Sequence, residues 1–306
     1  MGGALAAAYP EAEAALAEAE AAFTGAADGA ASGASRVSLR AMLADGPDDQ
    51  LTLTEHAQPA ILAVSVAAAR VLAAQGIQPA FVAGHSLGEY SAHVVAGTFS
   101  LADGVAIVRR RGRYMQESVP VGTGTMAAVL GLDAALVDQA CREAADGEIV
   151  SAANLNAPGQ VAIAGHAAAV ARASDRAKAL GARRVVPLTV SAPFHCALMK
   201  PAQDRLEPEL RTVATCRPRV PVVANVDAEL KRDAGAAIDA LVRQVTATVR
   251  WQDVVERLAA EGVSTFIEVG PGTVLAGLVK RIRKEARVVS FSSPDHLEAV
   301  RAACSI

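Results

Sequence analysis

Short apolar runs alternate with longer amphipathic segments along much of the chain. Apolar and small residues recur at helical spacing over 58–75, which predicts a helix that Gly76 ends. The apolar run 80–83 is short enough for a buried strand, and the proline-free stretch behind it predicts a second helix. Strands that alternate with helices in this way indicate a mainly parallel sheet with helices on both faces. The fold class that we predict is therefore α/β, with a large hydrolase-like domain.

The pattern changes near Met126, where strands lie closer together in the sequence. The order of the predicted elements is β-α-β-β-α-β, which is typical of a ferredoxin-like unit. We therefore expect a small α+β subdomain at 125–188, inserted into a large domain made of 1–124 and 189–306. The predicted strands are 126–132, 149–155, 160–165 and 184–188, and the predicted helices are 133–145 and 167–180.

The first residues, 1–23, read as one helix in which alanines alternate with glutamates, without the basic and then apolar order of a signal peptide. A stretch of small residues at 24–35 and a Gly-Pro-Asp-Asp sequence at 46–49 predict a loop and a turn. Later in the chain, 265–269 reads as a strand that a Gly-Pro-Gly turn joins to a helix over 273–284, and 288–291 reads as a last short strand.

Composition narrows the class of protein. The chain has 306 residues, of which 52% are hydrophobic and 20% charged, and its formal net charge is −3. No uninterrupted apolar run approaches the roughly 20 residues of a membrane span, so we expect a soluble cytoplasmic protein. This net charge gives no indication of nucleic-acid binding. The four cysteines have no metal-binding spacing, which predicts buried, reduced thiols and no metal site.

The stretch Gly84–Tyr90 carries the strongest candidate chemistry. It reads Gly-His-Ser-Leu-Gly-Glu-Tyr between a predicted strand and a predicted helix. A Gly-x-Ser-x-Gly turn in that position is typical of a nucleophile elbow, which exposes a serine at a helix N-terminus. There, unpaired N–H groups can stabilise an oxyanion. The simpler alternative is a glycine-rich turn in which Ser86 only caps the helix.

A serine nucleophile needs a base within hydrogen-bond reach. The chain has six histidines. His85 and His93 belong to the elbow and its helix, His166 to the inserted unit and His296 to the C-terminal end, whereas His195 ends an extended segment after a Pro-Phe step. We take His195 as the candidate base.

Five motifs occur together and in order, and together they are highly specific. The sequence resembles malonyl-CoA:acyl carrier protein transacylase, the discrete acyltransferase of bacterial fatty acid synthesis, from about Met1 to the last strand. The motifs are Gly-His-Ser-Leu-Gly-Glu-Tyr-Ser at 84–91, Arg-Arg-Gly-Arg-Tyr-Met-Gln at 110–116, Asn-Ala-Pro-Gly-Gln-Val-Ala-Ile-Ala-Gly at 156–165, Phe-His-Cys-Ala-Leu-Met at 194–199 and Glu-Val-Gly-Pro-Gly at 268–272.

The resemblance implies a ping-pong reaction that passes the malonyl group from malonyl-CoA to the phosphopantetheine thiol of acyl carrier protein, for fatty acid biosynthesis. Ser86 would carry the malonyl ester, and His195 would take its proton and later activate the carrier thiol. The family orients this histidine with a backbone carbonyl, and the matching residue is Gln244. Leu87, as the residue after the nucleophile, would donate its N–H to the oxyanion.

The resemblance also implies residues that recognise the substrate. Arg111 would hold the malonyl carboxylate, and a planar guanidinium can do so with two parallel hydrogen bonds. Phe194 would crowd the space of an α-methyl group, which predicts malonyl over methylmalonyl. Gln58 resembles a glutamine that lines the pocket, although a surface position is the alternative. Asn156 would approach the site or serve only as turn chemistry before Ala-Pro-Gly.

The expected partners are malonyl-CoA and acyl carrier protein, with no bound cofactor, no nucleic acid and no membrane, and we expect a monomer. Carrier proteins are acidic, so a basic patch is expected near the mouth of the site. Lys280 and Arg281 are the candidates; their alternative role is to complement a helix C-terminus.

The sequence differs from the family pattern at its N-terminal end. Family members begin with a strand and a Gly-Gln-Gly-Ser-Gln segment whose first glutamine gives a second oxyanion donor, and Met1 aligns with residues C-terminal to that segment. Either the true start lies upstream or one strand and one donor are missing, and loss of one donor can cost about 10²–10³ in rate. A catalytically impaired carrier-binding protein is therefore one alternative function.

A serine esterase or thioesterase is the other alternative, because an elbow and a histidine serve both reactions. Such a hydrolase would place its acid between the serine and a late histidine. Only Asp295 beside His296 is placed for that, and adjacent residues do not easily form a relay.

Overall fold

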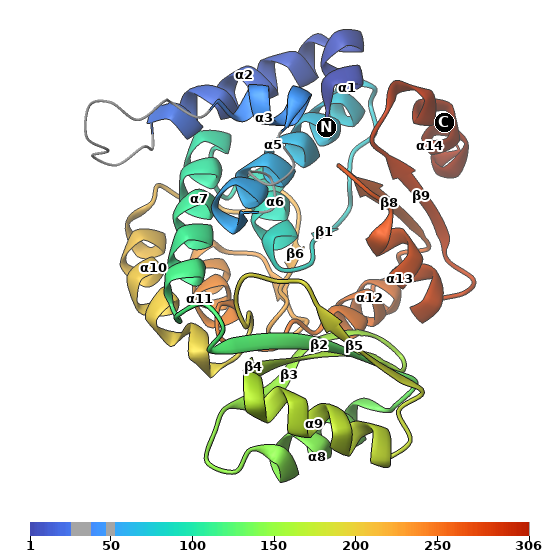
Figure 1. Cartoon of the computed structure of the whole chain (residues 1–306). Coiled ribbons are helices and arrows are strands. Elements are labelled where there is room, and N and C mark those ends of the chain that lie inside the picture. The colour runs from blue at the N-terminus through green and yellow to red at the C-terminus, as the bar shows by residue number, and fades with distance from the viewer. Residues whose placement is uncertain (26–37, 47–52, 306) are drawn as a thin grey trace.

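The computed structural model describes residues 1–25, 38–46 and 53–305. A large part carries most of the helices, and a smaller part holds a four-stranded sheet with two helices on its outer face (Figure 1). This arrangement confirms the predicted α/β class with two subdomains. The predicted loop at 24–35 and turn at 46–49 fall largely outside the described residues.

The small part has the strand order β3-β4-β2-β5, and every neighbouring pair is antiparallel. The crossover helices α8 and α9 pack against each other and on this sheet, and their alanine and valine faces close a separate apolar core. This is the ferredoxin-like arrangement that the element order predicts. The elements are β2 (Gly124–Leu130), α8 (Ala134–Ala144), β3 (Val150–Ala157), β4 (Gln160–His166), α9 (Ala167–Ala179) and β5 (Arg184–Leu188).

The large part carries its parallel pairs in two sheets. In the first, β1 pairs in parallel with β6, and β6 pairs antiparallel with β7. In the second, β8 and β9 pair in parallel along their whole length. The strand before the elbow is only two residues long, shorter than the apolar run predicts. The strands are β1 (Val82–Ala83), β6 (Val222–Val223), β7 (Leu230–Lys231), β8 (Thr265–Val269) and β9 (Arg287–Phe291).

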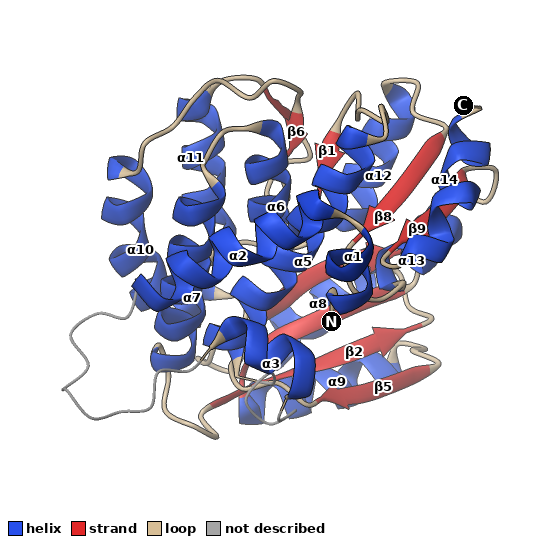
Figure 2. Cartoon of the chain, turned by 90° about the horizontal axis from the view of Figure 1, so that it is seen from above, coloured by secondary structure: helices blue, strands red, loops and turns tan. Residues whose placement is uncertain are grey.

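Helix α5 (Thr54–Ala74) forms the centre of the largest apolar core, where it packs against α2, α6 and α7 (Figure 2). It is long and apolar enough to cross a membrane by length and composition, but 67% of that window is buried inside the protein, as in the core helix of a globular protein. The other helices are α1 (Gly3–Ala8), α2 (Pro10–Gly25), α3 (Leu39–Asp45), α6 (Leu87–Ala96), α7 (Leu101–Glu117), α10 (Lys200–Thr212), α11 (Ala234–Gln244), α12 (Trp251–Ala260), α13 (Val274–Ile282) and α14 (Leu297–Cys304), with short 3₁₀ turns at Ala197–Met199 and Pro294–His296.

Three local expectations differ from the structure. The predicted first helix is two helices, because Pro10 has no N–H to continue α1 and instead begins α2. Asn156 lies inside strand β3, so the turn role considered for it is wrong, and the turn falls at Pro158 and Gly159. Of the four thiols, Cys216 is exposed and lies in the loop after α10.

Candidate active site

The turn at Ser86 has the strained backbone of a nucleophile elbow. Ser86 has φ 52° and ψ −106°, which is rare for a residue with a side chain, and it immediately precedes helix α6. A Cβ atom on Gly84 would collide with the backbone of Gly88, so only glycine fits where the strand and helix approach. The glycines of the motif therefore let the chain present Ser86 at the helix N-terminus.

Asn225 fixes the elbow from behind. Its Oδ1 accepts a hydrogen bond from the Ser86 N–H at 2.7 Å, and its Nδ2 donates to the Gly84 carbonyl at 2.8 Å. The asparagine is fully buried, two residues past strand β6. One amide thus satisfies a donor and an acceptor on the two sides of the turn, which holds the unusual conformation of Ser86 in place.

His195 faces Ser86 directly. Its Nε2 lies 2.7 Å from Ser86 Oγ, and its Nδ1 lies 3.0 Å from the main-chain carbonyl of Gln244. Since a carbonyl oxygen only accepts, the proton sits on Nδ1 and leaves Nε2 free to accept the Ser86 proton. Gln244 is the residue that the family resemblance implies for holding the ring, and no carboxylate takes part in either bond.

Arg111 reaches the same point from helix α7. It is only 2% exposed, and its guanidinium donates to Gln58 Oε1 at 2.7 Å, to Gln244 Oε1 at 3.0 Å and to Ser86 Oγ at 3.1 Å. It also lies 5.2 Å from the centre of the Tyr90 ring. These acceptors are neutral, so the site holds a buried positive charge beside the serine without a directly bonded carboxylate.

Burial sets the protonation of the groups around Ser86. Loss of water, and then the nearby Arg111 charge, lower the pKa of His195 to about 3, so the imidazole is neutral at physiological pH and its Nε2 lone pair is available to accept a proton. Burial also raises the pKa of Glu89 to about 7. The geometry thus provides a hydroxyl, a neutral base and a cation within one small volume.

Two further candidates, Asn156 and Phe194, lie where the large and small parts of the fold meet. Asn156 of β3 places its Oδ1 2.9 Å from Nε2 of the His85 ring. The His85 ring also packs against Trp251, with ring centres 5.9 Å apart. Phe194 is half-buried between the large core and the sheet of the small part. Asn156 therefore contacts the residue that precedes Ser86, and Phe194 is itself the residue that precedes His195.

The remaining candidates are placed differently. Leu87 is the first residue of α6, where helix N–H groups have no intrahelical partner. Lys280 and Arg281 are exposed near the end of α13, and Arg281 donates to Gln160 Oε1 of the small part at 3.3 Å. Neither contacts the Ser86 cluster in any hydrogen bond within the described part of the chain.

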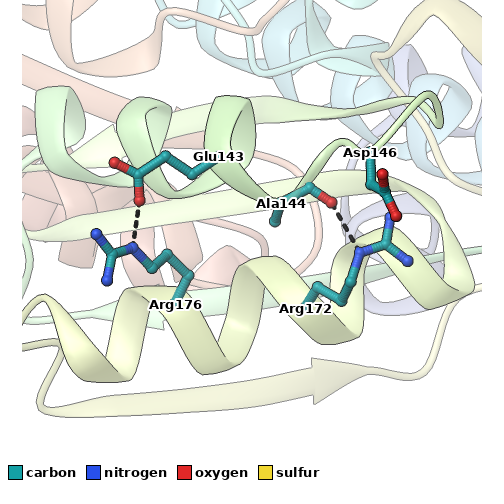
Figure 3. A pocket seen from close by; sticks show the side chains of 5 residues that line it. All are labelled: Glu143, Ala144, Asp146, Arg172 and Arg176. Carbon is teal, nitrogen blue, oxygen red and sulfur yellow. Dashed lines mark hydrogen bonds and ion pairs between the residues drawn. The ribbon is translucent and has the colours of Figure 1, made fainter.

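A cavity of about 470 Å³ lies away from this cluster, between α8 and α9 (Figure 3). Figure 3 shows that Arg176 pairs with Glu143 and that Arg172 donates to the Ala144 carbonyl. Arg172 also pairs with Glu148 beside the cavity, so both lining arginines already have carboxylate partners, and no serine, cysteine or histidine is among the lining residues.

Sequence reasoning missed three residues of the site. Glu89 and Asn225 are fully buried beside Ser86, and His85 bonds across to the small part. The signal for Glu89 was its place in the first turn of the elbow helix. Asn225 ends the apolar run 220–225, where a polar residue at a strand end is a candidate in an α/β fold.

The arrangement suits nucleophilic acyl transfer. A serine held by a neutral histidine can form an ester, and a buried guanidinium beside it can bind an acyl group that carries a carboxylate. The fold and site therefore define a serine-dependent acyl transferase. The family model described as acyl transferase domain matches residues 1–303.

Similar proteins of known name identify which acyl transferase family the chain belongs to. The chain is 51% identical over 270 residues to the malonyl CoA-acyl carrier protein transacylase of Salmonella typhimurium, a match that covers 88% of this chain and 87% of that protein. The crystal structure of an acyl carrier protein S-malonyltransferase from Vibrio cholerae matches with a TM-score of 0.92 at 44% identity, covering 98% of this chain and 94% of that one. The chain therefore belongs to the malonyl CoA-acyl carrier protein transacylase family.

A second solved structure contains a partner protein. A malonyl-transacylase in complex with its holo type II PKS acyl-carrier protein matches with a TM-score of 0.91 at 44% identity, over 99% of this chain and 94% of that one.

Proposed function

We propose that this protein transfers the malonyl group from malonyl-CoA to the phosphopantetheine thiol of acyl carrier protein through a malonyl ester of Ser86, in the cytoplasm and for fatty acid biosynthesis. The observation that carries the proposal is the placement of a buried Arg111 guanidinium 3.1 Å from the Oγ of a serine that already faces a neutral histidine. Family membership and the relative bound to a carrier protein support both substrates.

The first half-reaction loads the serine. His195 Nε2 takes the hydroxyl proton while Ser86 Oγ attacks the thioester carbonyl of malonyl-CoA. The Leu87 N–H faces the developing oxyanion, and the α6 dipole favours the same negative charge. When the C–S bond breaks, the proton on His195 passes to the coenzyme A thiolate. The products are free coenzyme A and malonyl-Ser86.

The second half-reaction reverses these roles with a different thiol. The phosphopantetheine thiol gives its proton to His195 and attacks the ester carbonyl of malonyl-Ser86. Ser86 Oγ leaves and recovers the proton. The Gln244 carbonyl accepts from Nδ1–H throughout, so it orients the ring and stabilises the positive charge that the ring carries between the two proton transfers.

Arg111 and Phe194 set the choice of acyl group. The free malonyl carboxylate binds the Arg111 guanidinium, which can make two charge-assisted hydrogen bonds to it. Gln58 accepts from one end of that guanidinium and so helps to orient it. The Phe194 ring stands next to His195 and crowds the position of an α-methyl group, which favours malonyl over methylmalonyl.

An esterase or thioesterase has no use for a buried guanidinium beside its serine. The late histidine that such an enzyme would need is also engaged elsewhere, since His296 Nδ1 accepts from the Ser292 N–H in the C-terminal region. Transfer and hydrolysis are separated by following malonyl-CoA with and without phosphopantetheinylated carrier. Malonyl-carrier should form much faster than free malonate; fast malonate release that ignores the carrier would support a hydrolase.

The pH dependence of Ser86 malonylation should lack the usual histidine inflection. Because burial holds the pKa of His195 near 3, well below its ordinary 6.5, the ring stays in its neutral, proton-accepting form as the pH falls through that range. Rapid-quench measurements from about pH 5.5 to 8 should give no half-maximal loss of rate near the ordinary histidine pKa. A clear loss centred there, present equally in the unmodified protein and in Glu89→Gln, would show that His195 titrates normally, because Glu89 is the other buried group of the site with a pKa near that range.

Reversing the charges of Lys280 and Arg281 to Glu should weaken the carrier step alone. Both side chains are exposed on α13, where they can pair with acidic residues of a carrier. We expect the KM for the carrier to rise about tenfold at low salt, with less effect at high salt. Malonylation of Ser86 by malonyl-CoA is the internal control. An unchanged KM for the carrier would place the docking surface elsewhere.

A further inference from the structure

Glu89 lies between the residues that hold Arg111 and the residues that hold Ser86. The proposed reaction gives it no role. It sits in the first turn of α6, three residues after Ser86, and its side chain is fully buried. Buried carboxyl groups are rare unless a specific partner holds them. The partners of this one are two neutral amides that come from distant parts of the chain.

The first partner is the side chain of Gln244. Its Nε2 donates to Glu89 Oε2 at 2.7 Å and to the Ser86 carbonyl at 2.9 Å, while its Oε1 accepts from Arg111 at 3.0 Å. A guanidinium can only donate, so a reversed amide would bring its N–H₂ against Arg111. The acceptors at Glu89 and at the Ser86 carbonyl together hold the N–H₂ end of the Gln244 amide, with Glu89 at the shorter distance, and so turn its Oε1 toward Arg111.

The second partner is the main chain of Asn225. Its N–H donates to the same Glu89 Oε2 at 3.0 Å. The side chain of Asn225 in turn holds Ser86 N and the Gly84 carbonyl. One oxygen of Glu89 thus accepts hydrogen bonds from both Asn225, which holds the Ser86 turn, and Gln244, which orients the Arg111 guanidinium.

We propose that Glu89 is a positioning residue whose accepting oxygen aligns Arg111 with the malonyl carboxylate and Ser86 with the thioester, and so contributes to the preference for malonyl. The inference rests on the proposed transferase function. Within the described residues, Glu89 Oε1 has no hydrogen-bond partner, so only Oε2 is used. Burial raises the pKa of this carboxyl to about 7, and its neutral and ionised forms both leave an oxygen that can accept.

Two substitutions separate this role from a packing role. Glu89→Gln keeps the shape and one accepting oxygen, whereas Glu89→Met keeps the length and removes both oxygens. We expect Glu89→Gln to retain kcat/KM for malonyl transfer within about threefold. Glu89→Met should lower it about 30-fold and should lower acetyl transfer less, so that the malonyl-to-acetyl preference falls about fivefold. Ser91→Ala is the matched control, because Ser91 is buried on the same helix and its Oγ has no partner among the described residues.

The outcomes also separate this inference from the proposed function. If the unmodified protein transfers no malonyl, the proposed function fails whatever the variants do. If it does, and folded Glu89→Met keeps the same kcat/KM and preference, or Glu89→Gln loses as much as Glu89→Met, the positioning role is overturned. Should Glu89→Met not fold, Glu89→Asp replaces it: withdrawal of the oxygen by one methylene should lower the malonyl preference, and an unchanged preference would overturn the inference.

Discussion

Replacing His195 by alanine is expected to lower malonyl transfer by about 10³-fold, because a general base contributes roughly 10²–10⁴ to the rate. The loss should appear in both half-reactions, since the same Nε2 takes the proton of Ser86 and later that of the carrier thiol. Rapid-quench measurement of malonyl-Ser86 formation, followed by single-turnover transfer to the carrier, resolves the two steps. The KM for malonyl-CoA should change little, because His195 does not bind the carboxylate.

His166→Ala is the control for this prediction. His166 ends strand β4 in the small part, and its Nδ1 accepts from the Ile149 N–H, far from the elbow in sequence and in fold. Its loss should leave both half-reactions nearly unchanged. If His195→Ala slowed only one half-reaction, a second base would have to serve the other, and the symmetric scheme would be wrong.

Replacing Arg111 by alanine is expected to reverse the acyl preference. Truncating one partner of a buried charge pair costs about 2–5 kcal/mol, so malonyl transfer should fall on the order of 100-fold in kcat/KM. Acetyl transfer has no carboxylate to lose and should fall far less. The measurement is the ratio of kcat/KM for malonyl-CoA and acetyl-CoA in the variant and the unmodified protein.

Two arginine variants sharpen that result. Arg111→Lys keeps the charge but not the planar pair of donors, so it should recover only part of the malonyl activity. Arg110→Ala removes the adjacent arginine, which pairs with Glu209 away from Ser86, and should leave the preference unchanged. Equal losses of malonyl and acetyl transfer in Arg111→Ala would contradict a carboxylate-binding role and would indicate a general effect on the elbow.

The parts of the site that sequence predicts are those that local geometry determines. The elbow needs glycine at 84 because the helix backbone lies against it, and the short Gly-x-Ser-x-Gly motif makes this requirement visible in the sequence. The ferredoxin-like unit is predictable for a similar reason, since its element order and short connections leave few topologies. The roles of Arg111 and Gln244, and the role of His195 as the base, are those that the family resemblance implies.

The parts that sequence does not predict depend on contacts between distant segments. Asn225 is 139 positions from Ser86 and Gln244 is 155 positions from Glu89, so no periodicity joins them. The resemblance pointed to the main-chain carbonyl of Gln244, whereas its side chain, which links Arg111 to Glu89, had no sequence signal. Asn156 illustrates the opposite error: its turn-like neighbours suggested a loop, yet it lies in a strand that pairs with β4.

The central claim is that an acyl group passes through Ser86 on its way between two thiols. Intact-mass and peptide mass spectrometry after incubation with malonyl-CoA test it most directly. The account predicts one malonyl adduct, located on Ser86, that disappears when phosphopantetheinylated carrier is added while malonyl-carrier appears, and no adduct in Ser86→Ala. The absence of an adduct on a folded protein that still makes malonyl-carrier, or an adduct on another residue that the carrier discharges, would contradict it.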